Sequence, residues 1–213
     1  MDQELIFSMD VVIIPLGPLG SNMYVVTSET GYLIVDPSVS PSEPALKTKL
    51  GDDFTKKIRG ILLTHAHFDH SFYLDDWANV VSCPYFMSDD DKEILKTPNL
   101  NCSSDMFKPL SMKTETTDPG DSFTIDGLNI SVIRTPGHTP GSVCFLFEEQ
   151  KVMFTGDTLF AGSCGRSDLP RGNGKVLMDS LRKLKTLDDD IVIYPGHGYY
   201  SKIGMEKQFN PFL

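Results

Sequence analysis

Three of the five histidines in this chain fall within six positions, in the stretch THAHFDH at residues 64–70. The stretch sets His65, His67 and His70 beside a carboxylate, Asp69. Neutral imidazole and carboxylate are ligands that zinc, iron and manganese accept. Crowded into a non-helical turn without a cation, these groups would be costly to desolvate and would repel one another once protonated. The spacing therefore predicts a metal site.

The remaining histidines and a second aspartate each follow another apolar run. SVIRTPGH ends at His138, KVMFTGD ends at Asp157, and IVIYPGH ends at His197. Rigid strands that end at one edge of a fold can hold polar side chains around a common point. The predicted ligand set is therefore His65, His67, Asp69, His70, His138, Asp157 and His197. Seven ligands exceed one tetrahedral ion and suit two ions that share a carboxylate, with water completing the coordination.

A structural zinc site is the simpler alternative, but such a site normally closes at four ligands and is rich in cysteine. The four cysteines of this chain, Cys83, Cys102, Cys144 and Cys164, are scattered and form no close pair. We expect them to be reduced thiols.

The elements that must position the ligands alternate between strand and helix. Apolar and β-branched runs predict strands at 10–16, 22–28, 31–38, 57–65, 80–88 and 190–198, with hairpins at 122–138 and 142–160. Helical spacing and capping residues predict helices at 40–53, 71–80, 89–97 and 176–187. No linker rich in proline, glycine or serine divides the chain, so residues 1–213 are expected to form a single domain. Strands in both halves with interleaved helices suit two packed sheets with helices outside.

Residues 97–119 show little periodicity, and we interpret them as a lid or binding loop. The net charge of −10 argues against a nucleic-acid partner. No apolar run approaches the roughly 18 residues that cross a bilayer, so no membrane partner is expected. The acidic start, MDQELIFSMD, lacks the features of a secretory signal and predicts a cytoplasmic protein. We expect a small-molecule substrate and a monomer or small homo-oligomer.

Four motifs in order, THAHFDH, TPGHTPGS, FTGDTLF and YPGHG, resemble those of the metallo-β-lactamase-fold hydrolases across nearly the whole chain. The resemblance implies an α/β fold, a four-layered αββα sandwich of two mixed sheets with a dinuclear site at one edge. It further implies that one metal is held by His65, His67 and His138, the second by Asp69, His70 and His197, and that Asp157 bridges the two.

Two further segments, GDTLFAGSCGRSDLPRG and the closing NPFL, look most like the single-domain bacterial members of the glyoxalase II group. Enzymes of that group hydrolyse S-acyl-glutathione thioesters. Two-domain members carry a helical C-terminal domain that supplies much of the glutathione site. The resemblance predicts no such domain here, because the chain ends 16 residues after His197.

The expected chemistry is hydrolysis of a thioester or ester by a hydroxide held between two divalent ions, zinc first, with iron or manganese as alternatives. Asp69 is expected to orient the hydroxide or to shuttle its proton, besides binding metal. Thr64 and Thr155 are given structural roles. Cys164 and Arg166 follow the bridging aspartate and could face the substrate.

Several other functions stay open. A persulfide dioxygenase of similar fold would hold a single iron with two histidines and one aspartate, whereas the complete second set, including His70 and His197, favours a dinuclear hydrolase. True β-lactamase activity is disfavoured because no secretion signal is visible. A nucleic-acid-processing relative is disfavoured by the acidic charge, and a flavo-diiron protein by the histidine at position 67. A non-catalytic metal-binding protein is the remaining alternative.

Overall fold

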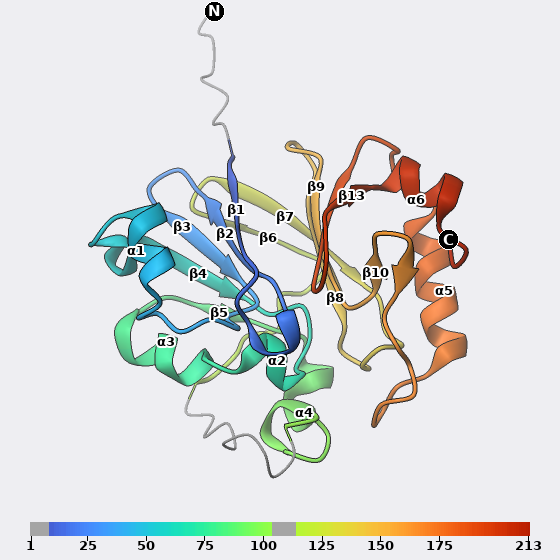
Figure 1. Cartoon of the computed structure of the whole chain (residues 1–213), viewed down its shortest axis with the longest axis horizontal. Coiled ribbons are helices and arrows are strands. Elements are labelled where there is room, and N and C mark those ends of the chain that lie inside the picture. Colours follow the sequence, from blue (N-terminus) through green and yellow to red (C-terminus); the bar gives the residue numbers. More distant parts are fainter. Residues whose placement is uncertain (1–8, 104–113) are drawn as a thin grey trace, which may run out of the picture.

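Two mixed sheets face each other between outer helices in the computed structural model, which describes residues 9–103 and 114–213. Figure 1 shows α1 and α3 outside one sheet and α5 outside the other. This arrangement confirms the αββα sandwich that the sequence motifs implied. Successive side chains on a strand point to opposite faces of the sheet, and apolar residues stand on both faces. Each sheet therefore has two apolar faces to bury, and this requirement produces the layered arrangement.

The first sheet has the order β1-β2-β3-β4-β5. Its strands are β1 (Val11–Ile14), β2 (Met23–Thr27), β3 (Tyr32–Val35), β4 (Ile58–Leu62) and β5 (Tyr85–Phe86). The pairs β1–β2 and β2–β3 are antiparallel, and the pairs β3–β4 and β4–β5 are parallel.

The second sheet has the order β13-β12-β9-β8-β7-β6. Its strands are β6 (Ser122–Ile125), β7 (Leu128–Arg134), β8 (Val143–Phe147), β9 (Val152–Gly156), β12 (Val192–Pro195) and β13 (Ser201–Lys202). The β9–β12 pair is parallel and the other pairs are antiparallel. A small separate ribbon pairs β10 (Leu159–Phe160) with β11 (Ser163–Cys164).

The helices are short, apart from α5. They are α1 (Pro44–Leu50), α2 (Phe68–Ser71), α3 (Leu74–Val80), α4 (Lys92–Lys96), α5 (Gly174–Leu184) and α6 (Ile203–Phe209), with 3₁₀ turns η1 (Pro18–Gly20), η2 (Phe54–Lys57) and η3 (Asp89–Asp91). None of the helices in these described ranges has the length and apolar character that a bilayer crossing requires.

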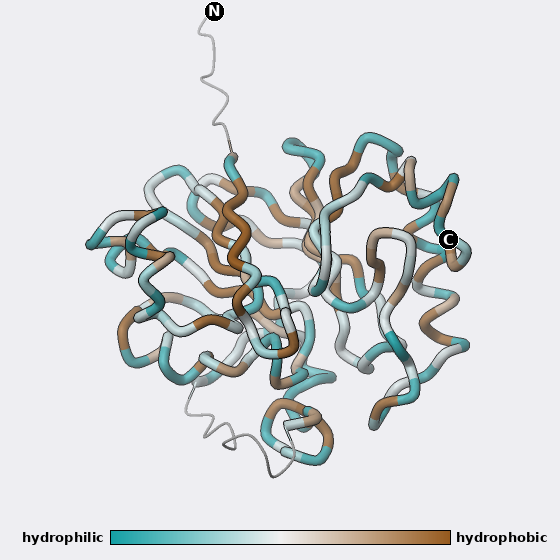
Figure 2. The backbone as a smooth tube through the Cα atoms, viewed as in Figure 1, coloured by the Kyte–Doolittle hydropathy of each residue, from teal (hydrophilic) through white to brown (hydrophobic). Residues whose placement is uncertain are grey.

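Strand β2 shows how the sequence divides the interior into layers. Tyr24 and Val26 pack between the two sheets, against residues such as Phe145 and Phe154. Met23 and Val25 point the opposite way, into the core beneath the outer helices. Successive side chains on a strand point to opposite faces, so one apolar run supplies both layers. Figure 2 shows brown, hydrophobic stretches along this strand region and teal on many outer loops.

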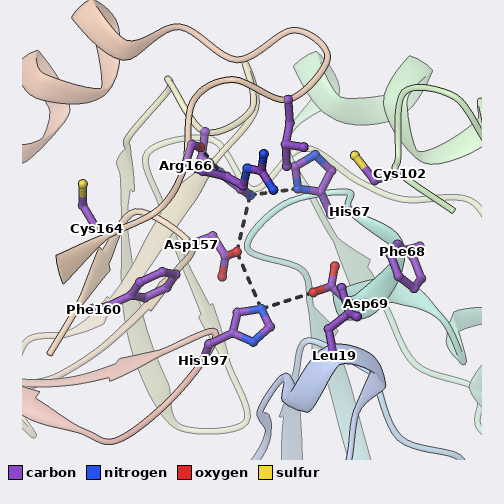
Figure 3. A pocket seen from close by; sticks show the side chains of 12 residues that line it. Leu19, His67, Phe68, Asp69, Cys102, Asp157, Phe160, Cys164, Arg166 and His197 are labelled. Carbon is purple, nitrogen blue, oxygen red and sulfur yellow. Dashed lines mark hydrogen bonds and ion pairs between the residues drawn. The ribbon is translucent and has the colours of Figure 1, made fainter.

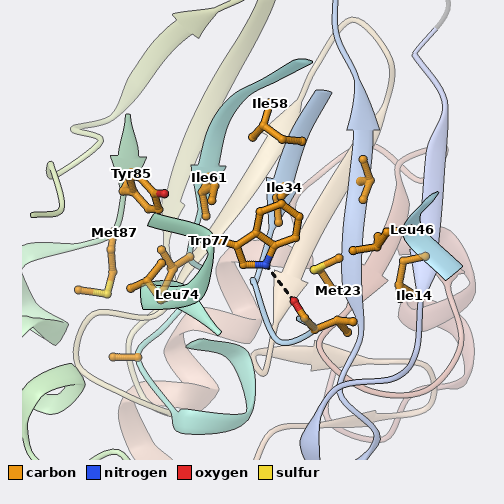
Figure 4. Close-up of a cluster of buried hydrophobic side chains, with 14 of the residues drawn as sticks. Ile14, Met23, Ile34, Leu46, Ile58, Ile61, Leu74, Trp77, Tyr85 and Met87 are labelled. Atoms are coloured by element: carbon orange, nitrogen blue, oxygen red, sulfur yellow. Dashed lines mark hydrogen bonds between the residues drawn. The ribbon is translucent and has the colours of Figure 1, made fainter. Parts of the chain in front are cut away.

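Trp77 of α3 anchors the outer layer of the first sheet. Its ring is fully buried in the same cluster as Ile34 and Ile61, and its indole Nε1 donates to the Val39 carbonyl at 2.9 Å (Figure 4). A buried Trp needs a partner for its N–H, so this bond lets the ring fill the space between helix and sheet. On the other side, Leu177 and Leu181 of α5 cover the second sheet.

Most predicted elements are present, with two differences. The strand predicted at 80–88 shortens to β5, because α3 runs to Val80 and Pro84 has no N–H to donate to a ladder. The hairpin predicted at 142–160 ends with β9 at Gly156, and its last two residues, Leu159–Phe160, form β10 and pair with β11 instead. Beyond the predicted elements, β11, β13 and α6 had no periodic signal of their own. Part of the loop predicted at 97–119, residues 104–113, lies outside the described residues.

Candidate metal centre

All five histidines follow the ends of buried strands, as the sequence predicted. Strand β4 leads to His65, β7 is followed by His138, β9 leads directly to Asp157, and β12 leads to His197. The structure brings the predicted side chains together at one edge of the sandwich. Their ligand atoms form three overlapping groups, each within 4.8 Å: His65, His67 and His138; His65, His70 and Asp157; and Asp69, His70 and His197.

One local expectation was wrong. The THAHFDH stretch was taken as a non-helical turn, but Phe68–Ser71 form α2, a single helical turn with His67 at its N-cap. The N–H groups of His70 and Ser71 both bond to the His67 carbonyl. The helical turn divides the motif, because His65 and His67 lie before it whereas Asp69 and His70 lie on it. His67 contributes to one outer group and Asp69 to the other, while His65 and His70 meet in the middle group with Asp157.

The Nδ1 atoms of three histidines bond to groups that force them to act as donors. His70 Nδ1 lies 2.9 Å from the Asp36 carboxylate, and His138 Nδ1 lies 2.7 Å from the Arg166 carbonyl. Thr64 gives its hydroxyl proton to Asp36 Oδ2 at 2.8 Å, so it accepts from His65 Nδ1 at 3.1 Å. In the neutral ring each Nε2 then keeps its lone pair, the arrangement typical of metal-binding histidines with outer partners.

Asp157 lies between the groups. Its Oδ1 is 3.3 Å from His70 Nε2, and its Oδ2 is 3.5 Å from His138 Nε2 and 3.7 Å from His197 Nε2. Asp69 Oδ2 lies 3.2 Å from His197 Nε2. Figure 3 shows Asp157, Asp69 and His197 pointing toward one another at the cavity. A carboxylate with one oxygen toward each group is suited to bridging two cations.

Several polar atoms of this cluster are buried without a hydrogen-bond partner among the described residues. They include His65 Nε2 and His67 Nε2. Buried polar atoms left unpaired destabilise a fold, so such a concentration at one point calls for a ligand. Imidazole nitrogens and carboxylate oxygens together fit divalent cations, and the number of donors suits a dinuclear site.

The surroundings shift the pKa values of the ligands in both directions. Burial lowers the pKa of His65 well below its ordinary value and lowers the pKa of His67 to about 3. Burial also disfavours charge on His70, but the carboxylates of Asp157 and Asp69 outweigh it and raise the pKa of His70 well above its ordinary value. Although burial would raise the pKa of Asp157, His70 keeps it well below its usual range. The carboxylates are therefore ionised at neutral pH.

Two buried aspartates that support the site were missed by the sequence reasoning. Asp36, at the end of β3, accepts from His70 and twice from Thr64, through its N–H and its hydroxyl. Asp91 accepts from Ala66 N at 2.9 Å, Thr139 Oγ1 at 2.8 Å and Gly141 N at 2.7 Å. Asp36 carried a usable signal, an acidic residue directly after a buried strand. Asp91 carried no such signal, because it lies within the acidic run Asp89–Asp91.

The cluster forms the floor of a cavity of about 450 Å³. Leu19, Phe68, Phe160 and Leu169 line its apolar walls, and Cys102, Cys164 and Arg166 also border it. Figure 3 shows Cys102 and Cys164 on opposite sides. Burial raises the pKa of both thiols, so neither is an activated nucleophile.

The other residues singled out from the sequence divide into two kinds. Thr64 touches a ligand, as described, and was wrongly given a merely structural role. Thr155 donates to the Leu159 carbonyl and is structural, as expected.

The αββα fold and a His/Asp cluster at its edge define a metallo-hydrolase architecture, and comparison with known proteins gives the family. The model of the metallo-beta-lactamase superfamily matches residues 16–197. The chain belongs to this superfamily.

Among similar proteins, a "Hydroxyacylglutathione hydrolase GloC" of Haemophilus influenzae is 34% identical over 96% of this chain and 98% of its own length. A "Probable metallo-hydrolase YqgX" of Bacillus subtilis is 32% identical over 93% and 95%.

Two solved structures are similar along nearly their whole length. BLEG-1, described as a B3 metallo-beta-lactamase, has a TM-score of 0.85 and 36% identity, covering 96% of this chain and 99% of that one. TTHA1623 in a di-iron-bound form has a TM-score of 0.83 and 32% identity, covering 95% and 100%.

Proposed function

We propose that this protein is a dinuclear metal-dependent hydrolase of thioesters of the S-acyl-glutathione type. The observation that carries the proposal is the set of three overlapping His/Asp groups on the floor of one cavity. The similarity to the GloC hydrolase over nearly the full length of both chains supports the substrate class. A cavity of about 450 Å³ is of the size that encloses small-molecule substrates.

In this proposal His65, His67 and His138 hold one ion, Asp69, His70 and His197 hold the second, and Asp157 contacts both. Zinc is the first choice because histidine and carboxylate are its ordinary catalytic ligands. Iron is the principal alternative, since the similar TTHA1623 was crystallised in a di-iron form. Manganese accepts the same ligands.

Divalent ions held here would lower the pKa of coordinated water towards 7 and polarise a substrate carbonyl. The chain supplies a base beside them. Burial would raise the pKa of Asp69, but His70 and the hydrogen bond from His197 lower it below its usual value. The Asp69 carboxylate is therefore ionised at neutral pH. We assign it the role of orienting the attacking water and accepting its proton.

The cavity walls suit the rest of the substrate. Leu19, Phe160 and Leu169 offer apolar surface for an acyl group and exclude water from the scissile bond. Arg166 borders the same cavity, and its guanidinium pairs with Asp168 at 2.7 Å. This guanidinium is a cation that a substrate carboxylate could engage at the cavity.

The test is an assay of metal-loaded protein, with its metal content quantified, against S-lactoylglutathione and short-chain thioesters that lack glutathione. The proposal predicts release of free thiol, lost on chelation and restored by added zinc or iron. The variant Asp69→Asn, which removes both a ligand of the second ion and the assigned base, should bind that ion more weakly and should lose most of the turnover even when metal is added in excess. Thioester hydrolysis that is absent in fully loaded protein would contradict the proposal.

Two other activities should be measured on the same metal-loaded protein. The likeness to BLEG-1 at 36% identity makes β-lactam hydrolysis the second candidate, which nitrocefin turnover would reveal. A persulfide dioxygenase would instead take up oxygen on glutathione persulfide with one iron per chain. The second ligand group, Asp69, His70 and His197, favours hydrolysis over this oxidation.

A further inference from the structure

A short segment directly before β2, Ser21 and Asn22, lies against the second ligand group. Both residues are buried, at 0% and 1% exposure. They precede β2 and form an isolated antiparallel bridge, Ser21 with His197. A residue of the first half of the chain is thus paired directly with a predicted ligand that follows β12 in the second half.

The side chains of this segment bond to backbone on both sides of the second group. Ser21 Oγ donates to the Asp69 carbonyl at 2.7 Å. Asn22 Nδ2 lies 3.1 Å from the Pro195 carbonyl and 3.0 Å from the Gly198 carbonyl, the residues that flank His197. The backbone N–H of Asn22 donates to the Gly196 carbonyl at 2.8 Å. Two of the three second-group residues, Asp69 and His197, are therefore held by one segment.

The first group is held by a different residue. Asp91 ties Ala66, between His65 and His67, to Thr139 and Gly141, which follow His138. Among the described residues, no side-chain hydrogen bond of Asp91 reaches the loop of His197, and none of Ser21 or Asn22 reaches His138. Ser21 and Asn22 thus support the second group and Asp91 supports the first, whereas Asp36 bonds to His70 and, through Thr64, to His65.

We infer that Ser21 and Asn22 are positioning residues for the second metal ion, and that weakening them releases that ion while the first stays bound. The inference rests on the dinuclear centre proposed above. Outer partners of metal ligands typically change metal affinity by about 10- to 100-fold when they are removed. Asn22→Ala is therefore expected to weaken binding of one ion by about that factor and to leave the other unchanged.

The experiment is a zinc titration of metal-free protein against a chromophoric chelator, with metal content checked by mass spectrometry. The wild type should bind two ions, and Asn22→Ala should bind one tightly and one weakly. Adding His138→Ala to Asn22→Ala should remove the tight site, because that histidine belongs to the first group. Adding His197→Ala to Asn22→Ala should instead leave the tight site in place, because that histidine belongs to the second group.

Asn210→Ala is the matched control. Asn210 is a buried asparagine whose Nδ2 also donates to two backbone carbonyls, those of Phe160 and Ser163, and it should leave both affinities unchanged. If Asn22→Ala does not fold, Ser21→Ala, which removes the single bond to Asp69, should weaken the same ion by a smaller factor.

Two failures are distinguishable. A wild type that binds fewer than two ions contradicts the dinuclear centre itself. A wild type with two ions, together with variants at Asn22 or Ser21 that keep both affinities or lose both equally, contradicts only the inference.

Discussion

Asp157 lies within 3.7 Å of histidines from both ligand groups, so its loss should disturb both metal positions. We expect Asp157→Asn to lower metal content and to reduce kcat/KM for the thioester by more than the roughly 100-fold typical of outer partners. Metal analysis and steady-state kinetics measure the two effects. Asp179→Asn, an exposed aspartate on α5, should leave both values near those of the wild type. Full metal content in Asp157→Asn would rule out a bridging role.

Metal uptake should release protons. The carboxylates around His70 raise its pKa well above the ordinary value, and Asp69 and Asp157 raise that of His197 despite its burial. In metal-free protein at neutral pH His70 therefore carries a proton, which a cation must displace. Apparent affinity is then expected to fall as pH falls below the raised pKa values. Calorimetric titrations in two buffers of different ionisation enthalpy should show net proton release, and equal heats in both would contradict this expectation.

At the scale of single residues, the metal ligands could be predicted from the sequence, whereas the residues that hold these ligands in place could not. His138, Asp157 and His197 each end an apolar run in a turn of glycine, proline or threonine, a pattern visible without coordinates. Asn22 and Asp91 act through bonds to backbone groups far away in the chain. An isolated buried asparagine or aspartate has no spacing that marks it, so only the tertiary structure identifies it.

Among the elements, the turn after β12 approaches the ligands most closely at Gly196. A Cβ added there would lie 2.2 Å from Asp157 Oδ1 and 2.5 Å from His70 Cε1. We expect Gly196→Ala to displace these side chains and to weaken metal binding. The measurement is metal content together with thermal unfolding.

Gly198→Ala separates this steric effect from backbone strain. Gly198 has a φ of +77°, but an added Cβ meets nothing within 4 Å. The variant should lose about 1–2 kcal/mol of stability and keep its metal. Equal metal loss in both variants would contradict the steric account.

The strength of the local signals decided which elements the sequence revealed. The turn Asp126-Gly127, with φ values of 43° and 78°, gives the β6–β7 hairpin that this pair predicts. Strands β10, β11 and β13 have two residues each, too few for a period to register. Helix α6 is held by tertiary bonds, such as that from Gly162 N to Glu206, which no local pattern encodes.

For the whole molecule, the first half supplies His65, His67, Asp69 and His70, and the second half supplies His138, Asp157 and His197. Bound ions would therefore join the two sheets. A ligand that binds only the folded state stabilises it, by about 4 kcal/mol at a thousand times its Kd. For a chain of this size that corresponds to a rise in Tm on the order of 10 °C.

Chelation should reverse that rise. Differential scanning calorimetry with and without chelator measures the change in Tm. The Tm of the double variant His138→Ala/His197→Ala should change little when chelator is added. A chelator that leaves the Tm of the wild type unchanged would show that metal does not join the two halves.

The central claim is that two cations bind between these seven side chains, and anomalous diffraction from metal-loaded crystals tests it most directly. The account predicts two anomalous peaks at the cavity floor, one contacting His65, His67 and His138 and the other contacting Asp69, His70 and His197, with Asp157 beside both. A cavity floor with no peak in metal-loaded crystals, or ions bound only elsewhere on the molecule, would contradict it.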